Sequence, residues 1–359
     1  MQVKKNLLGC SIESLESFFI EIDEPKFRAK QVLKWIHQKG ILDFDFMTDL
    51  NKDLRNKLKS IAHIKPPTIH EKHTSKEGTI KYLIELESGS MVEMVEIPEQ
   101  KRKTLCVSSQ AGCALQCTFC ATGAQGFDQN LDKHEIIGQL WLANFHKKVN
   151  EPITNIVFMG MGEPLLNCDA VIESVKIMKH QLAYGLSRKR ITISTSGIVP
   201  NIKKLYDEID VSLAISLHAP DDKLRNEIVP INNKYPISSL MDACKNYLSK
   251  YESKRSITIE YILIDGVNDS IQQAKKLTKL LSTISCKINL IPFNGFTGST
   301  YRRPTMEKIN LFKDYLMKKG FITTLRITRG DEVDGACGQL VGNLTNSIKG
   351  KHLISHKSI

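Results

Sequence analysis

The spacing of apolar residues changes along the chain, and the first 75 residues have the spacing of helices. There the apolar positions recur every three to four residues, as on one face of an amphipathic helix. One helix is predicted over residues 26–36, because Pro25 lies at its start and Gly40 just beyond its end. We therefore expect residues 1–75 to form a small helical accessory domain.

Two β-rich runs follow the helical part. Residues 79–86 and 91–97 are rich in β-branched and aromatic residues and are separated by the turn-forming pair Ser88 and Gly89. This pattern predicts a β-hairpin, and we expect residues 76–98 to act as a hairpin linker.

From Thr104 onward, short apolar runs alternate with helical patterns. Strands are predicted at residues 105–108, 155–159, 191–195, 211–217, 256–263 and 287–292. Helices are predicted at residues 132–148, 168–180, 199–208, 237–250, 270–284 and 304–319, the first opened by a capping box of Asp132 and Glu135. Six consecutive βα units require a parallel sheet with right-handed crossovers. The sequence therefore predicts an α/β fold with a partial (β/α)6 TIM-type barrel over residues 99–335, followed by a C-terminal segment, 336–359.

Composition fits a globular protein of about two domains. The chain has 359 residues, of which 41% are hydrophobic and 25% charged. No apolar run approaches the roughly 20 residues of a membrane span, and the first residues lack the apolar stretch of a signal peptide. We expect a cytoplasmic protein with reduced thiols and no membrane contact.

The charge of the chain favours a polyanionic partner. The net charge is +11 and the isoelectric point about 9.1. Short basic runs occur at residues 101–103, 188–190, 302–303 and 318–319. Each run alone is equally consistent with a solvated face, but four runs in or beside loops favour an RNA or DNA surface.

Three cysteines form the most informative motif. Cys113, Cys117 and Cys120 have the spacing C-x3-C-x2-C on one short segment. Structural zinc usually takes four ligands in two separated pairs, and a disulfide framework suits small, cysteine-dense secreted domains, so both are disfavoured. A [4Fe-4S] cluster normally takes four cysteines. Three ligands leave one iron free to bind S-adenosylmethionine, whose reductive cleavage releases a 5′-deoxyadenosyl radical.

Polar residues follow the predicted strands at the ends where barrel enzymes gather their chemistry. They are the cysteine segment, residues 160–164, Ser194, residues 216–218 and Asn294. The glycines do not belong to a G-x-G-x-x-G dinucleotide motif, because residue 165 is leucine. Gly160 and Gly162 would let the backbone approach a ligand closely, and Glu163 could accept hydrogen bonds from a cationic amino group.

These motifs together resemble those of a known family. The cysteine triplet and the Gly-Glu-Pro segment at 162–164 resemble the radical S-adenosylmethionine superfamily. Residues 289–294 and 329–340 narrow the resemblance to the RlmN family, the dual-specificity RNA adenine-C2 methyltransferases of bacteria. The resemblance covers nearly the whole chain and implies that the helical domain binds RNA. It also implies that S-adenosylmethionine is bound by Gly162, Glu163, Ser194, Ser216, Leu217, His218 and Asn294.

The resemblance also assigns catalytic roles. Cys337 would take a methyl group from one S-adenosylmethionine, and a radical formed from a second would remove a hydrogen from that methyl. The methylene radical would add to C2 of adenine and join enzyme to RNA. Glu93 would then take the C2 proton, and Cys106 would release the product by forming a transient disulfide with Cys337. On the residues alone, Glu96 serves as the base equally well.

The implied substrates are an adenine of 23S rRNA in the peptidyl transferase centre and the adenine 3′ to the anticodon of tRNAs. An external one-electron donor such as flavodoxin or ferredoxin is implied, and we expect a monomer. One alternative is a Cfr-type enzyme that methylates the rRNA adenine at C8, although residues 329–332 resemble the C2 family's version. Another is a non-enzymatic RNA-binding protein with structural zinc.

Overall fold

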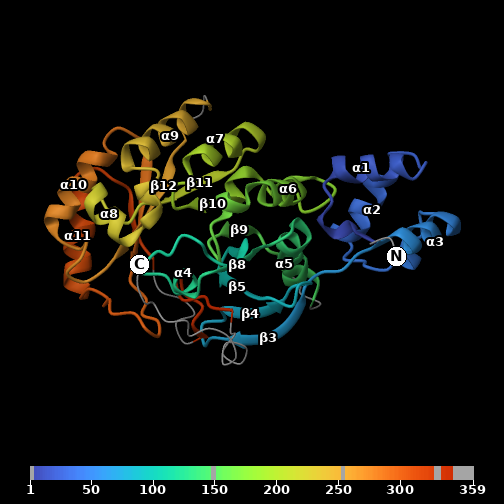
Figure 1. Cartoon of the computed structure of the whole chain (residues 1–359), viewed down its shortest axis with the longest axis horizontal. Coiled ribbons are helices and arrows are strands. Elements are labelled where there is room, and N and C mark those ends of the chain that lie inside the picture. The colour runs from blue at the N-terminus through green and yellow to red at the C-terminus, as the bar shows by residue number, and fades with distance from the viewer. Residues whose placement is uncertain (1–3, 147–150, 252–254, 327–332, 343–359) are drawn as a thin grey trace, which may run out of the picture.

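One large sheet organises the molecule (Figure 1). The computed structural model describes residues 4–146, 151–251, 255–326 and 333–342. Within these residues the sheet has ten strands in the order β14-β13-β12-β11-β10-β9-β6-β5-β4-β3. The strands from β6 to β14 in this order run parallel, and β5, β4 and β3 continue the sheet antiparallel.

The parallel part confirms the predicted partial barrel. Its strands are β6 (Arg102–Cys106), β9 (Asn155–Phe158), β10 (Ile191–Thr195), β11 (Ser212–Ser216), β12 (Ile257–Leu263), β13 (Cys286–Pro292) and β14 (Thr323–Leu325). The first six match the six predicted strands. The short strand β14 was missed by the sequence pattern, because three residues are too few to show a period.

Helices connect successive parallel strands, as the crossovers of a βα repeat require. The six predicted helices are α5 (Lys133–Phe145), α6 (Cys168–Lys179), α7 (Val199–Glu208), α9 (Ile237–Ser249), α10 (Ile271–Leu281) and α11 (Met306–Lys318). The capping box of Asp132 and Glu135 opens α5. Two short helices, α4 (Ala121–Gln125) and α8 (Asp222–Ile228), were not predicted.

The predicted hairpin is continuous with the barrel sheet. It consists of β4 (Ile80–Glu85) and β5 (Met91–Glu99), and β5 pairs with β6. The helical spacing predicted for residues 1–75 ends earlier than expected, because Thr68–Thr74 forms β3 at the sheet edge. Six of its seven residues are exposed, so the strand lacks the apolar alternation that reveals strands in a sequence.

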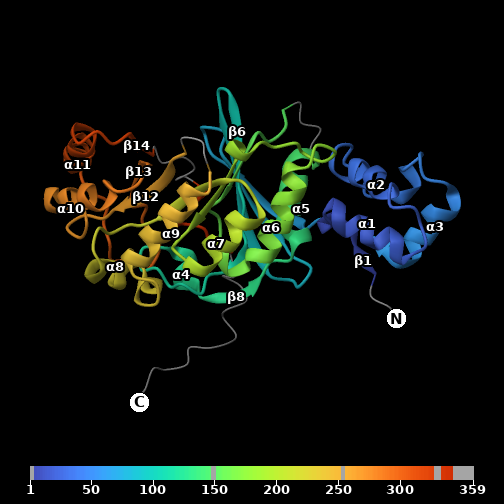
Figure 2. The same ribbon diagram turned by 90° about the horizontal axis from the view of Figure 1, so that it is seen from above.

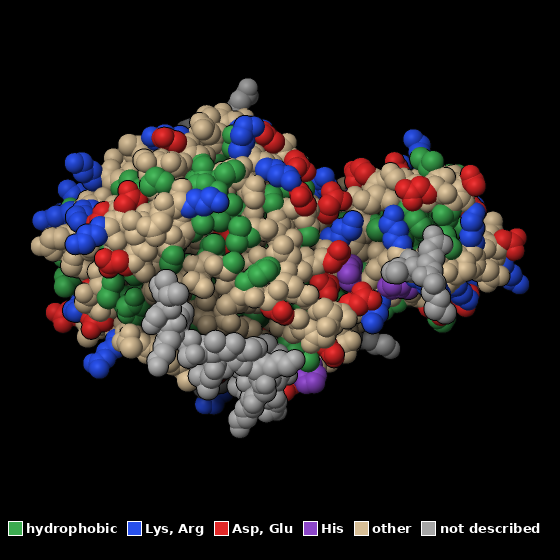
Figure 3. Space-filling model, viewed as in Figure 1, with side chains coloured by type: hydrophobic (Ala, Val, Ile, Leu, Met, Phe, Trp, Pro, Cys, Tyr) green, Lys and Arg blue, Asp and Glu red, His purple; other side chains and the backbone are tan. Residues whose placement is uncertain are grey.

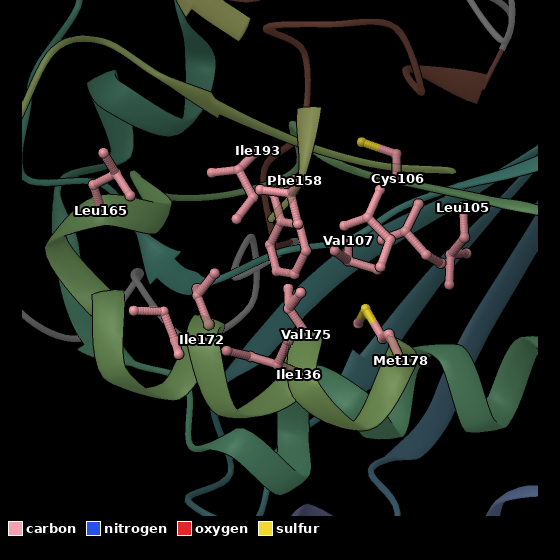
Figure 4. Close-up of a cluster of buried hydrophobic side chains, with 14 of the residues drawn as sticks. Leu105, Cys106, Val107, Ile136, Phe158, Leu165, Ile172, Val175, Met178 and Ile193 are labelled. Atoms are coloured by element: carbon pink, nitrogen blue, oxygen red, sulfur yellow. The ribbon is translucent and has the colours of Figure 1, made fainter. Parts of the chain in front are cut away.

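The core lies between the parallel strands and the helices that cover them. In Figure 4, Phe158 of β9 packs toward Val175 and Met178 of α6, and all three side chains are at most 2% exposed. The Cys106 sulfur points to the other side of the sheet in the same view. Side chains of the parallel strands thus alternate between this apolar core and the interior of the barrel.

A smaller helical lobe lies beside the barrel (Figure 2). It contains α1 (Ile12–Glu21), α2 (Arg28–His37) and α3 (Lys52–Ile61), and a two-stranded sheet of β1 (Lys5–Asn6) and β2 (Ala62–His63). Figure 3 shows it as a smaller body beside a larger one, with charged and histidine side chains around the neck between them.

Buried polar contacts fix this lobe against the barrel helices. Trp141 of α5 donates its Nε1–H to the carbonyl of Ile36 at 3.1 Å, and His37 Nδ1 lies 3.1 Å from the hydroxyl of Tyr184. Burial lowers the pKa of His37 to about 3, so its imidazole is neutral in this contact.

Among the described residues, no helix combines the length and apolarity that crossing a membrane would need.

Candidate active site

The cysteine loop is held by a small hairpin after β6. Strands β7 (Gln110–Gly112) and β8 (Phe127–Asn130) pair antiparallel on either side of the loop. Cys113 N–H donates to the carbonyl of Gly126 at 2.8 Å. Gly112 has φ +71°, and a Cβ there would lie 1.9 Å from the Gly126 oxygen, so only glycine fits at this closure.

The three thiols line one pocket at the carboxyl end of the barrel. Cys117 is 9% exposed, and Cys113 and Cys120 are partly buried. Burial raises the pKa of Cys113 to about 12, with a further contribution from the nearby Cys120. Among the described residues, no group of three His, Cys, Asp or Glu side chains is arranged to hold a single metal ion. Three neighbouring thiols on one loop instead suit a cluster, in which each thiolate binds a different iron atom.

The segment after β9 forms the next wall of the pocket. Gly162 has φ +93°, and a Cβ there would lie 2.4 Å from Cβ of Gln110. The glycine is therefore required by packing against β7. It also lines the pocket, and its predicted close approach to a ligand stays a prediction. Glu163 also lines the pocket, and its two carboxylate oxygens accept backbone N–H groups of Leu165 (3.1 Å) and Ser196 (2.8 Å). Burial raises the pKa of Glu163, and these donors oppose that effect.

Residues at the ends of β10 and β11 form the opposite wall. The hydroxyls of Ser194 and Ser216 lie 3.3 Å apart. His218 has φ +62°, and its Nδ1 accepts the backbone N–H of Ile262 at 3.0 Å. Burial lowers the pKa of His218 to about 3, so the ring is neutral and carries its proton on Nε2. The Phe119 ring of the cysteine loop packs edge-on against His218, with ring centroids 4.7 Å apart.

Arg225 of α8 joins the segments that follow β10 and β11, and it was missed by the sequence analysis. Its side chain is 0% exposed and donates to the carbonyls of Ser196 (2.6 Å), Ser216 (3.2 Å) and Leu217 (2.9 Å). Its partners are backbone carbonyls, which any residue type supplies, so no sequence motif reveals these contacts. Leu217 itself is buried and does not line the pocket.

Residues 333–342, here called the C-terminal strap, lie across the cysteine loop. Ala121 N–H donates to the carbonyl of Gly338 at 2.8 Å, and the Thr122 hydroxyl donates to the carbonyl of Leu340 at 2.6 Å. Asn294 Nδ2 donates to the carbonyl of Cys337 at 3.2 Å. Asn294 therefore contacts the strap and does not line the pocket of the three thiols, whereas Cys337 does.

Cys337 and Cys106 belong to one electrostatic group inside the barrel. Burial raises the pKa of Cys106 to about 12, and Cys337 contributes to the shift. Burial also raises the pKa of Cys337, and the guanidinium of Arg326 opposes this effect. Arg326 and Glu260, which also interacts with both thiols, were not predicted as site residues. For Glu260, the signal in the sequence is a charged side chain at an inward position of β12.

The structure distinguishes the two candidate bases, because they lie on opposite faces of β5. Glu93 is 2% exposed, accepts the backbone N–H of Val341 in the strap at 3.0 Å, and pairs with Lys81 at 3.1 Å. Burial raises its pKa to about 7, although Lys81 lowers it. Glu96 instead pairs with Lys103 at 2.7 Å on the other face. Only Glu93 therefore contacts the strap that carries Cys337.

Comparison with known proteins agrees with this geometry. Residues 5–64 match the family model "Ribosomal RNA large subunit methyltransferase N-terminal domain", and residues 107–278 match "Radical SAM superfamily". The chain is 52% identical to the dual-specificity RNA methyltransferase RlmN of Marinobacter nauticus, over 95% of this chain and 94% of the relative. It is 53% identical to the RlmN of Pseudomonas putida F1, over 96% and 91%.

A solved structure shows the same fold. The radical SAM methyltransferase of Sphaerobacter thermophilus superimposes with a TM-score of 0.88 at 39% identity, covering 94% of this chain and 100% of that one. Residues 329–332, which the sequence analysis used to separate C2 from C8 methylation, lie outside the described residues.

Proposed function

Because this chain belongs to the RlmN family of radical S-adenosylmethionine methyltransferases, we propose that it methylates C2 of an adenine in two kinds of RNA. The substrates are 23S rRNA, at the peptidyl transferase centre, and tRNAs, at the adenine 3′ to the anticodon. Both relatives are named dual-specificity RNA methyltransferase RlmN, which supports this choice over a C8 methyltransferase. The observation that supports catalysis most directly concerns Cys337: it lines the cysteine pocket, interacts electrostatically with Cys106, and belongs to the strap that Glu93 contacts at Val341.

Family membership implies S-adenosylmethionine and an iron–sulfur cluster. We assign one [4Fe-4S] cluster to Cys113, Cys117 and Cys120. When bound, the cluster supplies the electron that cleaves S-adenosylmethionine, and the radical chemistry starts there. The polar residues of the pocket walls, including Glu163 and His218, would bind and orient the cofactor.

The remaining residues handle the methyl group and the proton. Cys337 accepts the methyl group on its sulfur, which requires the thiolate, and Arg326 favours that charge. Glu93 takes the C2 proton of the adduct, and a pKa of about 7 suits a base that works near neutral pH. The Cys106 thiolate then attacks the Cys337 sulfur and forms a disulfide. The bond between that sulfur and the methylene carbon breaks, its electron pair stays on the carbon, and a proton taken up there completes the methyl group of the released adenine.

We further propose a cytoplasmic monomer that is reduced by a flavodoxin or ferredoxin. In this proposal residues 1–75 bind RNA, residues 76–98 form the hairpin, residues 99–335 the catalytic core and residues 336–359 the catalytic tail. The match of residues 5–64 to an rRNA methyltransferase domain supports the first assignment.

Mass spectrometry of the product tests the function. Anaerobically purified protein with S-adenosylmethionine, a chemical reductant and rRNA or tRNA fragments should yield 2-methyladenosine. The Cys113→Ala variant should lose this product. Formation of 8-methyladenosine would establish the alternative, and a colourless, zinc-containing protein that yields no product would refute the enzyme assignment.

A further inference from the structure

The interior of the barrel is polar beneath Cys337. In closed barrels of this type, bulky branched residues fill the interior. Here the inward positions of six strands carry small or polar side chains: Thr104, Asn155, Thr192, Thr258, Asn289 and Thr324. They are direct neighbours in two places, because Thr104 pairs with Asn155 and Asn289 pairs with Thr324. They line a cavity that adjoins the cofactor pocket.

Cys337 lies where the two spaces meet. It lines both the cofactor pocket and the polar cavity, together with Met159, Glu260 and Ile291. A sulfur in this position can face a methyl donor from one space and a methyl acceptor from the other. Glu93 lies on the same face of β5 as Ile97, which lines the polar cavity.

The polar cavity reaches the surface at the amino end of the barrel. Arg102 is the first residue of β6, Lys189 precedes β10 by two residues, and Lys287 is the second residue of β13. All three line the cavity and are exposed. We call them the basic rim. It includes residues from two of the four basic runs in the sequence, and it lies at the end opposite the cysteine loop.

We propose that the basic rim holds the RNA backbone and that the target adenosine enters the polar cavity from the amino end of the barrel to reach Cys337. This inference rests on the proposed RNA methylation. A base must leave its stack to be modified, and hydroxyl and amide side chains can form hydrogen bonds with its edges. Lysine and arginine hold the flanking phosphates. A reductant would instead dock near the cysteine loop, at the other end.

Two matched charge reversals test the proposal. The Lys189→Glu/Lys287→Glu variant changes the rim, and the Arg302→Glu/Arg303→Glu variant reverses two charges in the loop after β13, at the carboxyl end. Binding of a fluorescent tRNA anticodon stem-loop to each purified protein is measured across a salt series. The loss of two phosphate contacts should reduce the steepness of the plot of log association constant against log salt concentration by about 1.4. It should also weaken the affinity for RNA roughly tenfold at about 0.15 M salt.

The rim variant should show this loss, and the Arg302/Arg303 variant should bind nearly as the wild type does. The proposal is overturned if only the Arg302/Arg303 variant loses affinity. It is also overturned if neither variant loses affinity, or if both lose it equally. Wild-type protein that does not bind RNA would instead refute the proposed function. Slower reduction of the cluster with unchanged RNA affinity would assign the rim to the reductant and also overturn the proposal.

A second variant tests the path through the interior. Thr258→Phe narrows the cavity without changing a charge or a cofactor-pocket residue. Methylation of Cys337 in the absence of RNA, read from the protein mass, should persist, and RNA methylation should fall at least tenfold. RNA methylation at the wild-type rate would exclude this path.

Discussion

Replacing Lys81 with methionine should move the pH dependence of catalysis. The Lys81 and Glu93 side chains are 9% and 2% exposed, and their charged atoms lie 3.1 Å apart. Removing one partner of a buried ion pair costs about 3–5 kcal/mol, because the other charge is left uncompensated. Since one pKa unit corresponds to about 1.4 kcal/mol, the lower figure equals roughly two units. The pKa of Glu93 should therefore rise from about 7 to about 9.

Glu93 can accept a proton only when it is ionised. At pH 7.5 about three quarters of the carboxyl groups are ionised with a pKa of about 7, and about 3% with a pKa of about 9. Release of the protein–RNA adduct should therefore be about 25-fold slower in the variant, and the rate should recover as the pH rises toward about 9.5. Denaturing gels after a single turnover at each pH measure the adduct directly.

Lys103→Met is the matched control, because it breaks the ion pair with Glu96 on the opposite face of β5. Its profile should coincide with that of the wild type. The reasoning is refuted if Lys81→Met leaves the profile unchanged, or if both variants shift it equally.

Three further predictions follow from the site. Cys337→Ala should retain cleavage of S-adenosylmethionine but yield no methylated RNA by mass spectrometry, and appreciable product would contradict its role as methyl carrier. Arg225→Met leaves one buried and two partly buried carbonyls without their donor and should lower the free energy of unfolding by about 3 kcal/mol in urea titrations; a loss below about 1 kcal/mol would show that the carbonyls find other donors. RNA affinity should fall about 1,000-fold or more between about 50 and 200 mM salt if about 6–10 phosphates are contacted, and a flat response would exclude a phosphate-binding surface.

The sequence predicts those parts of the fold that are buried and repeated. The parallel strands are visible because their outward-facing residues are apolar and pack beneath the helices, and the capping box of Asp132 marks a helix start. The exposed edge strand Thr68–Thr74 has no apolar alternation, so its residues were assigned to the helical part. The antiparallel strands join the barrel sheet through pairing that no local pattern encodes.

The site divides in the same way. The cysteine spacing is a known motif and therefore visible, whereas the contacts of Arg225 with backbone carbonyls and of Arg326 with Cys106 depend on how the loops and strands are folded together. Glu93 and Glu96 are the same residue type in the same strand, and they differ in the face of the strand on which they lie. The distinction becomes visible once Lys81 and Val341 are in place.

The bond from Thr122 to Leu340 joins residues that are 218 positions apart. At a synthesis rate of about 5–20 residues per second, the ribosome completes the cysteine loop roughly 10–40 s before the strap. During that interval the loop has no cover from the strap. A cluster on these thiols, as proposed above, could therefore be inserted into the nascent polypeptide, before the strap that covers the loop has been made.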